Sequence, residues 1–227
     1  MNTLSTPKTT STSKVTDTWV QATWEEFLIE SENSEIEKLR CYYDRGWMRI
    51  ETMAIGFSHG KDNATLMMVV TLYGTFRNIA FLSLMNTSFQ KPRQRECQPD
   101  LAFYIGQPLP TIPRTNAPIS IDEYGPPTLA IEIAATSLSD DLGQKRLLYE
   151  RLGVVEYWVV NVETATVTAF AVKDGGSWQI QTSQALPGLT IAIVEEALHR
   201  SQTEDDGAIN RWLIQQFSQP VTPAENG

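Results

Sequence analysis

Residues 129–150, LAIEIAATSLSDDLGQKRLLYE, place a carboxylate inside an apolar strand and follow it with an amphipathic helix. Alternation along LAIEIA puts the large apolar side chains on one face and Ala130, Glu132 and Ala134 on the other. An ionised side chain in an apolar layer costs several kcal/mol unless it is paired. The fold must therefore bring a side chain or a metal ion to Glu132, and the two small neighbours leave room for it.

The helix after this strand has recognisable ends. Ser137 or Ser139 marks its start, the acids Asp140 and Asp141 favour the positive end of the helix dipole, and Gly153 ends it. The strand EYWVVN follows, so residues 129–161 read as a strand–helix–strand unit. This unit predicts an α/β or α+β fold with a mixed sheet.

One stripe of the predicted helix carries a lysine among apolar residues. Leu142, Lys145, Leu148, Tyr149 and Leu152 recur at steps of three and four residues. Lys145 should therefore lie on the buried face, above the strand that carries Glu132. Two interpretations stay open: a buried ion pair or snorkelling lysine, and a catalytic amine.

A second acid begins another predicted strand. In PDLAFYI, Asp100 and Ala102 share one face, so an acid again lies beside an alanine. Asp100 and Glu132, with the carbonyl of Ile133, could hold Mg²⁺ or Mn²⁺. Lys145 would then orient the attacking water or stabilise charge on a phosphate, which is the minimum set for metal-dependent phosphodiester hydrolysis.

The remaining chain predicts elements around this unit. Thr23 and Glu26 form a capping box that begins a short helix, and Asp44-Arg45-Gly46 forms the turn of a hairpin. A long buried helix starts near Ser58 or His59. Further expected elements are strands in NIAFLSL, RECQPDLAFYIG, VTAFAV and SWQIQ, a long loop over residues 106–127, and helices in IVEEALHR and NRWLIQQF.

Length and composition predict one domain. The chain has 227 residues, of which 41% are hydrophobic, and the Ser/Thr-rich start cannot bury enough apolar surface to fold. We expect a disordered leader over residues 1–17, a single domain over 18–217 and a flexible tail over 218–227. Without a membrane-spanning run or a secretory signal, and with Cys41 and Cys97 far apart, a cytoplasmic protein with reduced thiols and no membrane partner is expected.

Charge and histidine content narrow the candidate ligands. The net charge of −9 argues against a surface that binds nucleic acid everywhere. Lys91, Arg93 and Arg95 form either a local basic groove or a solvated loop. Because the only histidines are His59 and His199, a metal site must use oxygen ligands, which suit hard cations such as magnesium.

These motifs resemble a known nuclease superfamily. The order PD, then an acid inside EIA, then a lysine is similar to the PD-(D/E)XK superfamily with its restriction endonuclease-like fold. YYDRGWMRIETMAIGFSHG, ECQPDLAFYIG and LAIEIAATSLSDDLGQKRLLYERLGVVEYWVVN more closely resemble the Uma-two family of bacterial endonucleases, over roughly residues 22–200. The resemblance implies a mixed β-sheet flanked by α-helices, a divalent metal between the two acids, cleavage of DNA and a homodimer.

The chain departs from the superfamily pattern at the lysine. That residue usually stands two places after the second acid, where this sequence has Ala134, so its role carries over only if it has moved to Lys145. The neighbouring Gln144 could compete for the task. His59, where relatives also have a histidine, is an auxiliary candidate, with Asn63 one turn further along the same helix face.

Two functions compete at this point. The first is a metal-dependent endodeoxyribonuclease that uses Asp100, Glu132 and Lys145. The second is a catalytically inactive binding or assembly module that keeps the nuclease fold, in which Lys145 and Glu132 pair internally. Acid–base chemistry on a small molecule has little support, because no nucleophile–histidine pair or glycine-rich phosphate loop is present.

Overall fold

Two β-sheets organise the chain, which the computed structural model describes over residues 16–32, 39–53 and 56–218. The central sheet runs in the order β12 (Gly176–Ile180), β11 (Thr166–Lys173), β10 (Glu156–Asn161), β9 (Leu129–Ala134), β7 (Leu101–Ile105) and β4 (Phe81–Met85). The lateral sheet runs β1 (Val20–Gln21), β3 (Trp47–Thr52), β2 (Leu39–Asp44), β6 (Arg95–Cys97), β5 (Phe89–Lys91) and β8 (Ile119–Ser120). The predicted α/β class is confirmed, with a second sheet beside the expected one.

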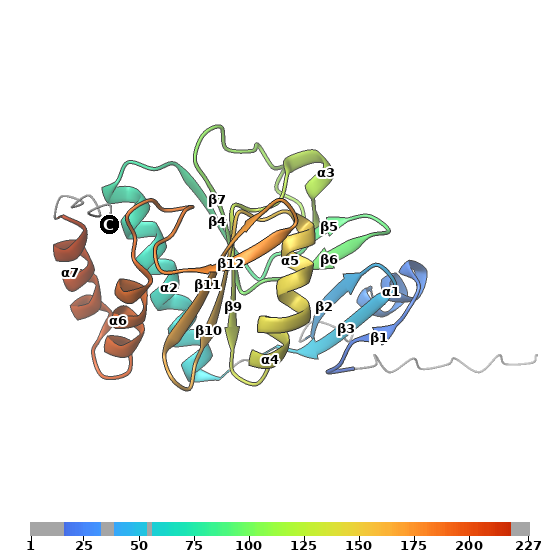
Figure 1. Ribbon diagram of the computed structural model, residues 1–227, viewed down its shortest axis with the longest axis horizontal. Helices are drawn as coiled ribbons and strands as arrows, with labels where there is room; N and C mark the ends of the chain where they lie inside the picture. The colour runs from blue at the N-terminus through green and yellow to red at the C-terminus, as the bar shows by residue number, and fades with distance from the viewer. Residues whose placement is uncertain (1–15, 33–38, 54–55, 219–227) are drawn as a thin grey trace, which may run out of the picture.

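Helices cover both faces of the central sheet (Figure 1). On one side lie α2 (Phe57–Phe76), α6 (Ile191–Ser201) and α7 (Asp206–Phe217). On the other lies the crossover between β9 and β10, built from α4 (Leu138–Asp140), a π-helical segment η2 (Asp141–Lys145) and α5 (Arg146–Leu152). The lateral sheet stands beyond α5, so the crossover is enclosed between the two sheets (Figure 1).

The strand–helix–strand unit agrees with the sequence prediction. β9 and β10 pair in parallel over six residue pairs, from Leu129 opposite Glu156 to Ala134 opposite Asn161. Ser137 precedes the first helical residue, and Gly153 ends α5 with φ +90°, a conformation that favours glycine. The π-helical turn was not predicted; such turns often mark functional sites.

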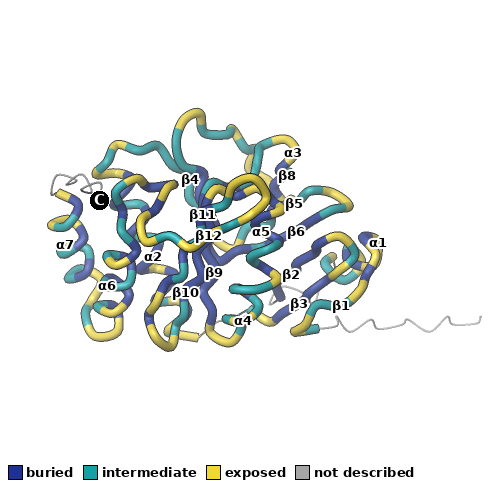
Figure 2. The backbone as a smooth tube through the Cα atoms, viewed as in Figure 1, coloured by how far each residue is buried: buried dark blue, intermediate teal, exposed yellow. Residues whose placement is uncertain are grey.

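The alternation of β9 separates two hydrophobic clusters. Leu129, Ile131 and Ile133 pack with the α2, α6 and α7 side, whereas Ala130 and Ala134 face the crossover and the lateral sheet. Both faces of β9 and β10 are buried (Figure 2). Glu132 therefore lies in the interior between the two sheets, as its alternation with the two alanines predicts.

Outside this unit, most predicted elements are confirmed. Thr23 and Glu26 form the capping box of α1 (Trp24–Ser31), which packs on the β2–β3 hairpin. The long helix starts at Phe57, one residue before the predicted point. Two expectations were wrong in part: β5 is an additional strand, and the predicted loop 106–127 contains β8 and α3 (Ile121–Tyr124).

The ends of the chain extend beyond the described residues. Of the predicted leader, residues 1–15 lie outside them, while the amides of Thr16 and Asp17 donate to the carbonyl of Ile50 at 2.9 and 3.2 Å. Of the predicted tail, Ser218 caps α7 and residues 219–227 lie outside. The described helices include none with the length and apolar character needed to cross a bilayer.

Candidate functional site

Asp100 and Glu132 come together on neighbouring strands. Antiparallel pairing of β7 with β9 sets Leu101 opposite Ile131, and the next step of that register sets Asp100 opposite Glu132. Both acids are 1% exposed. The amide of Ile133 donates to Asp100 Oδ2 at 2.7 Å, which fixes the carboxylate against the strand.

Two basic side chains contact the other oxygen of Asp100. Arg40, from β2 of the lateral sheet, binds Oδ1 through Nη2, and His59 Nε2 from the start of α2 lies 2.9 Å from the same oxygen. Arg40 Nη1 also lies 3.7 Å from Glu132 Oε2, so its guanidinium bridges the two acids. Burial opposes ionisation of Asp100, but contacts with His59 and Arg40 outweigh it and hold the pKa well below its usual range.

Glu132 is held mainly by neutral donors. The hydroxyls of Tyr149 and Tyr42 donate to Oε1 at 2.7 and 3.1 Å. Burial, with the negative charges of Asp141 and Asp100, raises the pKa of Glu132 to about 8 despite the opposing charges of Lys145 and Arg40. At neutral pH this carboxyl is therefore largely protonated, and the proton supplies positive charge that the cluster lacks.

Lys145 is buried as predicted, yet its ion-pair partners are not the predicted ones. Its Nζ lies 2.6 Å from Glu51 Oε1 and 2.9 Å from Asp141 Oδ1, and 4.2 Å from the ring centre of Tyr42. The expected direct pair with Glu132 is replaced by these two acids. Burial lowers the pKa of Lys145, but the charges of Glu132, Asp141 and Glu51 raise it more, so the amine stays protonated.

A chain of polar contacts continues from Glu51 to the surface. Arg49 Nε lies 2.8 Å from Glu51 Oε2 and 3.3 Å from Asp140 Oδ2, and Trp19 Nε1 donates to Asp140 Oδ1 at 2.7 Å. Ser137 Oγ donates to Asp141 Oδ2 at 2.6 Å. The site is therefore one connected cluster between the central and lateral sheets.

A cavity of about 60 Å³ opens onto this cluster. It is lined by four of the predicted site residues, Asp100, Glu132, Ile133 and His59, and also by Arg40, Arg49 and Glu51. Lys145 lies behind Glu51. Gln144 is exposed and lines two neighbouring surface cavities, and Asn63 Nδ2 lies 3.4 Å from His59 Nδ1.

The oxygen donors of the cluster suit a hard divalent cation by their chemistry. The cluster joins five carboxylates, Asp100, Glu132, Glu51, Asp140 and Asp141, to three permanent cations, Arg40, Arg49 and Lys145. Carboxylate oxygens are the ligands that magnesium prefers. Among the described residues, however, no group of three or more His, Cys, Asp or Glu side chains is arranged around a common point, and Arg40 occupies the position between the two acids.

Several members of the cluster were not predicted from the sequence. Arg40, Tyr42 and Glu51 come from a hairpin distant in the chain, and no local pattern connects them to Glu132. Asp141 was assigned only to the helix dipole, although its spacing of four from Lys145 signals an ion pair. Tyr149 was predicted only as part of the inward stripe, and its hydroxyl reaches Glu132.

Comparison with known proteins gives the fold and the family of the chain. A crystal structure described as a "putative nuclease belonging to DUF820" from Anabaena variabilis ATCC 29413 matches with a TM-score of 0.55 at 16% sequence identity, covering 78% of this chain and 99% of that one. At that identity the match shows the fold alone. No curated protein matches the chain. The model of the Uma2 family, described as "Putative restriction endonuclease", matches residues 24–210, so the chain belongs to the Uma2 family.

Proposed function

We propose that the protein is a metal-dependent endodeoxyribonuclease that hydrolyses phosphodiester bonds in DNA. The observation that supports this most is the meeting of Asp100 and Glu132, from adjacent strands, at one buried cavity beside the Lys145 cluster. Membership of the Uma2 family supports the same reaction class. Burial alone does not require two acids to lie close together, since the negative charge of Asp100 disfavours ionisation of Glu132.

In this proposal Asp100, Glu132 and the main-chain carbonyl of Ile133 hold Mg²⁺ or Mn²⁺. When bound, the cation would polarise the scissile phosphate and lower the pKa of an attacking water. To hold a cation, Glu132 would have to be ionised and Arg40 would have to release Asp100, with which it forms an ion pair. His59 keeps Asp100 ionised and oriented.

Lys145 has an electrostatic role. Because its pKa is raised, the ammonium cannot take a proton from water; it stabilises negative charge that develops at the cavity. Glu51 and Asp141 hold it in place at 2.6 and 2.9 Å. Gln144 contacts substrate at the surface and leaves the chemistry to the buried groups.

A plasmid assay tests the proposal. Parent protein is incubated with supercoiled plasmid and Mg²⁺ or Mn²⁺, beside Asp100→Asn and Lys145→Met. We expect nicking by the parent and a loss of at least about 100-fold in each variant, by analogy with the cost of disturbing metal-site groups. Asp174→Asn and Lys173→Met are matched controls, because both residues are exposed in the β11–β12 turn. Nicking that survives in both site variants would contradict the assignment.

A second function is favoured by one contact. Arg40 already bridges Asp100 and Glu132, as expected for a catalytically inactive module whose polar site is internal structure. Under that alternative neither Mg²⁺ nor Mn²⁺ changes the melting temperature, and no variant alters nicking. The homodimer implied by the family resemblance stays a prediction that light scattering on the purified chain tests.

A further inference from the structure

A surface cleft of about 470 Å³ lies beside the buried acids and shares only Gln144 with the site residues predicted from the sequence. It is lined by Trp19, Asp44, Arg45, Trp47, Gln144 and Arg151. These residues come from the first described segment, the β2–β3 turn, the π-helical segment and α5. The cleft therefore joins the lateral sheet to the crossover helix.

The aromatic side chains of the cleft are accessible. Trp47 is 44% exposed at the start of β3, and Trp19 is half-buried with its Nε1 already bonded to Asp140 at 2.7 Å. A tryptophan whose ring meets solvent in a cleft presents a face on which a nucleic-acid base can stack.

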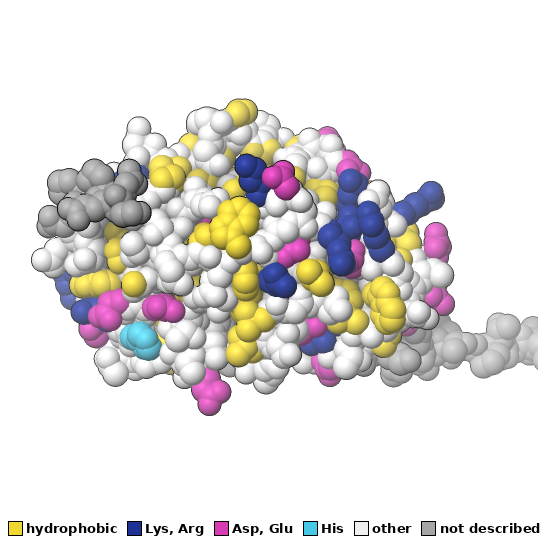
Figure 3. Space-filling model, viewed as in Figure 1, with side chains coloured by type: hydrophobic (Ala, Val, Ile, Leu, Met, Phe, Trp, Pro, Cys, Tyr) yellow, Lys and Arg dark blue, Asp and Glu magenta, His cyan; other side chains and the backbone are white. Residues whose placement is uncertain are grey.

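The cleft has a positive charge, whereas the chain as a whole has a net negative charge. Asp44 is neutralised by Arg95, whose Nε lies 3.0 Å away, and by an ion pair with Arg151. Arg45 is exposed, and its amide donates to the carbonyl of Gln94 at 2.9 Å, which joins this turn to the basic 91–95 segment. Lys and Arg side chains gather at this end of the molecule (Figure 3).

A second cavity adjoins both the cleft and the cavity of the buried acids. Gln144 also lines this second cavity, which has a volume of about 490 Å³. That cavity in turn shares Asp17, Arg49 and Ser137 with the cavity that contains Asp100 and Glu132. The three spaces therefore lie next to one another at the crossover, each sharing lining residues with the next.

We propose that this cleft is a binding subsite for single-stranded nucleic acid. An unpaired base stacks on Trp47 against Trp19, while Arg45 and Arg151 bind the phosphates that flank it. The strand then passes Gln144 toward the acid cavity. Only this last step, the direction of the strand, rests on the proposed nuclease function; binding in the cleft does not.

The test measures binding in EDTA, so that cleavage cannot occur. Fluorescence anisotropy compares a labelled dT15 strand with an abasic strand of the same length, which keeps the phosphates and lacks the bases. The parent should prefer dT15. Trp47→Ala should weaken dT15 binding roughly tenfold and leave the abasic strand unchanged. Asparagine suits the positive φ of Arg45 in that turn. Arg45→Asn should weaken the binding of both strands and reduce the slope of log affinity against log salt concentration by about 0.7.

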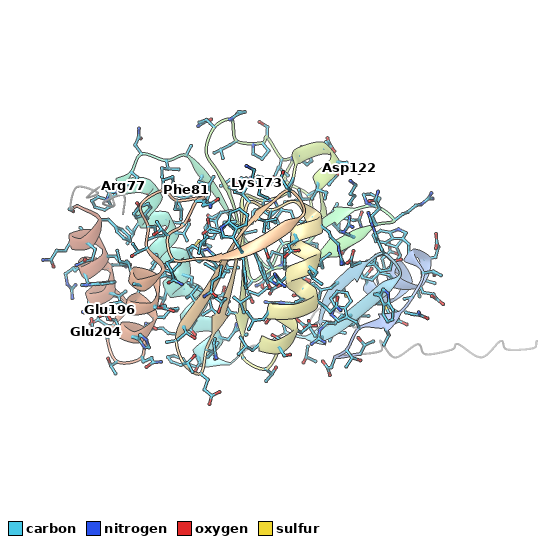
Figure 4. All side chains as sticks on the ribbon, in the orientation of Figure 1. Arg77, Phe81, Asp122, Lys173, Glu196 and Glu204 are labelled. Atoms are coloured by element: carbon cyan, nitrogen blue, oxygen red, sulfur yellow. The ribbon has the colours of Figure 1, made fainter. Side chains whose placement is uncertain are left out.

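Two control variants match these changes. Trp178 is 45% exposed on β12, nearly the same as Trp47, so Trp178→Ala controls for loss of a surface indole. Arg211 is exposed on α7, at the end of the molecule that carries Glu196 and Glu204 (Figure 4), so Arg211→Asn controls for loss of charge. Melting curves confirm that each variant is folded.

Several results would overturn the subsite. The first is that the parent does not bind dT15, and the second is that Trp47→Ala binds dT15 as tightly as the parent. The third is that polyglutamate displaces dT15 as readily as unlabelled dT15 does, which would indicate an acidic protein partner. The nuclease proposal is judged separately by plasmid nicking. Nicking that persists without cleft binding leaves that function standing, and binding without nicking leaves only the subsite.

Discussion

Two buried glutamates on neighbouring strands have opposite surroundings. Glu156, at the start of β10, is 0% exposed, and its oxygens accept four hydrogen bonds from neutral donors. Glu132, in the middle of β9, is 1% exposed and accepts only two, from Tyr42 and Tyr149. Its second oxygen faces Arg40 at 3.7 Å and lines the acid cavity.

The difference shows why burial of an acid does not by itself identify a site. Donors from Trp158, Ser183 and the amides of Gln184 and Ala185 surround Glu156, so it fixes the 183–185 turn against β10. Glu132 keeps unused acceptor capacity beside a second acid and an open space. Unused capacity of that kind is what a ligand needs.

The largest expected effect separates the two acids by activity. Glu132→Gln should reduce plasmid nicking about 10³-fold, equivalent to about 4 kcal/mol, because an amide cannot serve as an anionic metal ligand. Its melting temperature at neutral pH should not fall, since the amide oxygen can still accept from the two tyrosines and the amide needs no proton on folding, whereas the parent carboxyl does. Glu156→Gln is the matched control and should nick DNA at the parent rate. Equal nicking by both variants would remove the distinction.

The next largest effect distinguishes Glu156 from Glu132 by its contribution to the free energy of unfolding. Glu156→Ala removes the acceptor of four buried donors and should lower the free energy of unfolding by about 3 kcal/mol. Urea denaturation measures the loss, with Glu163→Ala, an exposed acid just after β10, as its control. A loss no larger than that of the control would mean that Glu156 has no structural role.

Arg40 gives a third way to sharpen the comparison. Arg40→Gln leaves Asp100 and Glu132 without their shared guanidinium and should lower the melting temperature in EDTA. Saturating Mn²⁺ should then restore roughly 2 kcal/mol or more, because the ion binds only the folded chain and no longer competes with the arginine.

The control for this experiment is Arg146→Gln, which removes a partly buried ion pair with Glu150 on the crossover helix. Its response to Mn²⁺ should equal that of the parent. If Mn²⁺ stabilises Arg40→Gln no more than the parent, the arginine does not occupy the metal position.

The sequence predicts the frame of the site better than its contacts. Glu132, Asp100 and buried Lys145 follow from alternation in strands and from the helical stripe, because both depend on residues close in the chain. Arg40 and Glu51 enter through a hairpin of the lateral sheet, and their approach depends on the packing of two sheets. Local periodicity contains no information about that packing. For this reason Glu132 was considered as the ion-pair partner of Lys145, and Glu51 was not.

The π-helical turn shows the same limit at a smaller scale. An uninterrupted α-helix was expected from Ser137 or Ser139 to Gly153, and the structure starts it after Ser137 and ends it at Gly153. The π turn adds Asp141 to the inward residues, since both Asp141 and Lys145 are 1% exposed. Their ion pair within the interior accompanies this turn, which no propensity rule predicts.

The smallest predicted effect, counted per pH unit, is a difference in pH dependence. Glu132 has a pKa raised to about 8 in the folded chain from an ordinary value of 4.5, so the folded state binds the proton more tightly. The stability that this provides is complete below pH 4.5 and is lost as the pH rises through 8. Relative to Glu132→Gln, the parent should lose up to about 1.4 kcal/mol per pH unit in that window.

Urea denaturation of the parent and of Glu132→Gln in EDTA measures this difference. The measurements run from about pH 5 to 8 in steps of about half a pH unit. Other buried acids also titrate there, since burial raises the pKa of Glu96 to about 7 and of Asp62 to about 6, but they are common to both proteins and cancel. Asp100, with its lowered pKa, destabilises the fold only on acidification below this window. Parallel curves for the two proteins would show that Glu132 is already ionised, and that its charge is balanced by Arg40 and Lys145 without a proton.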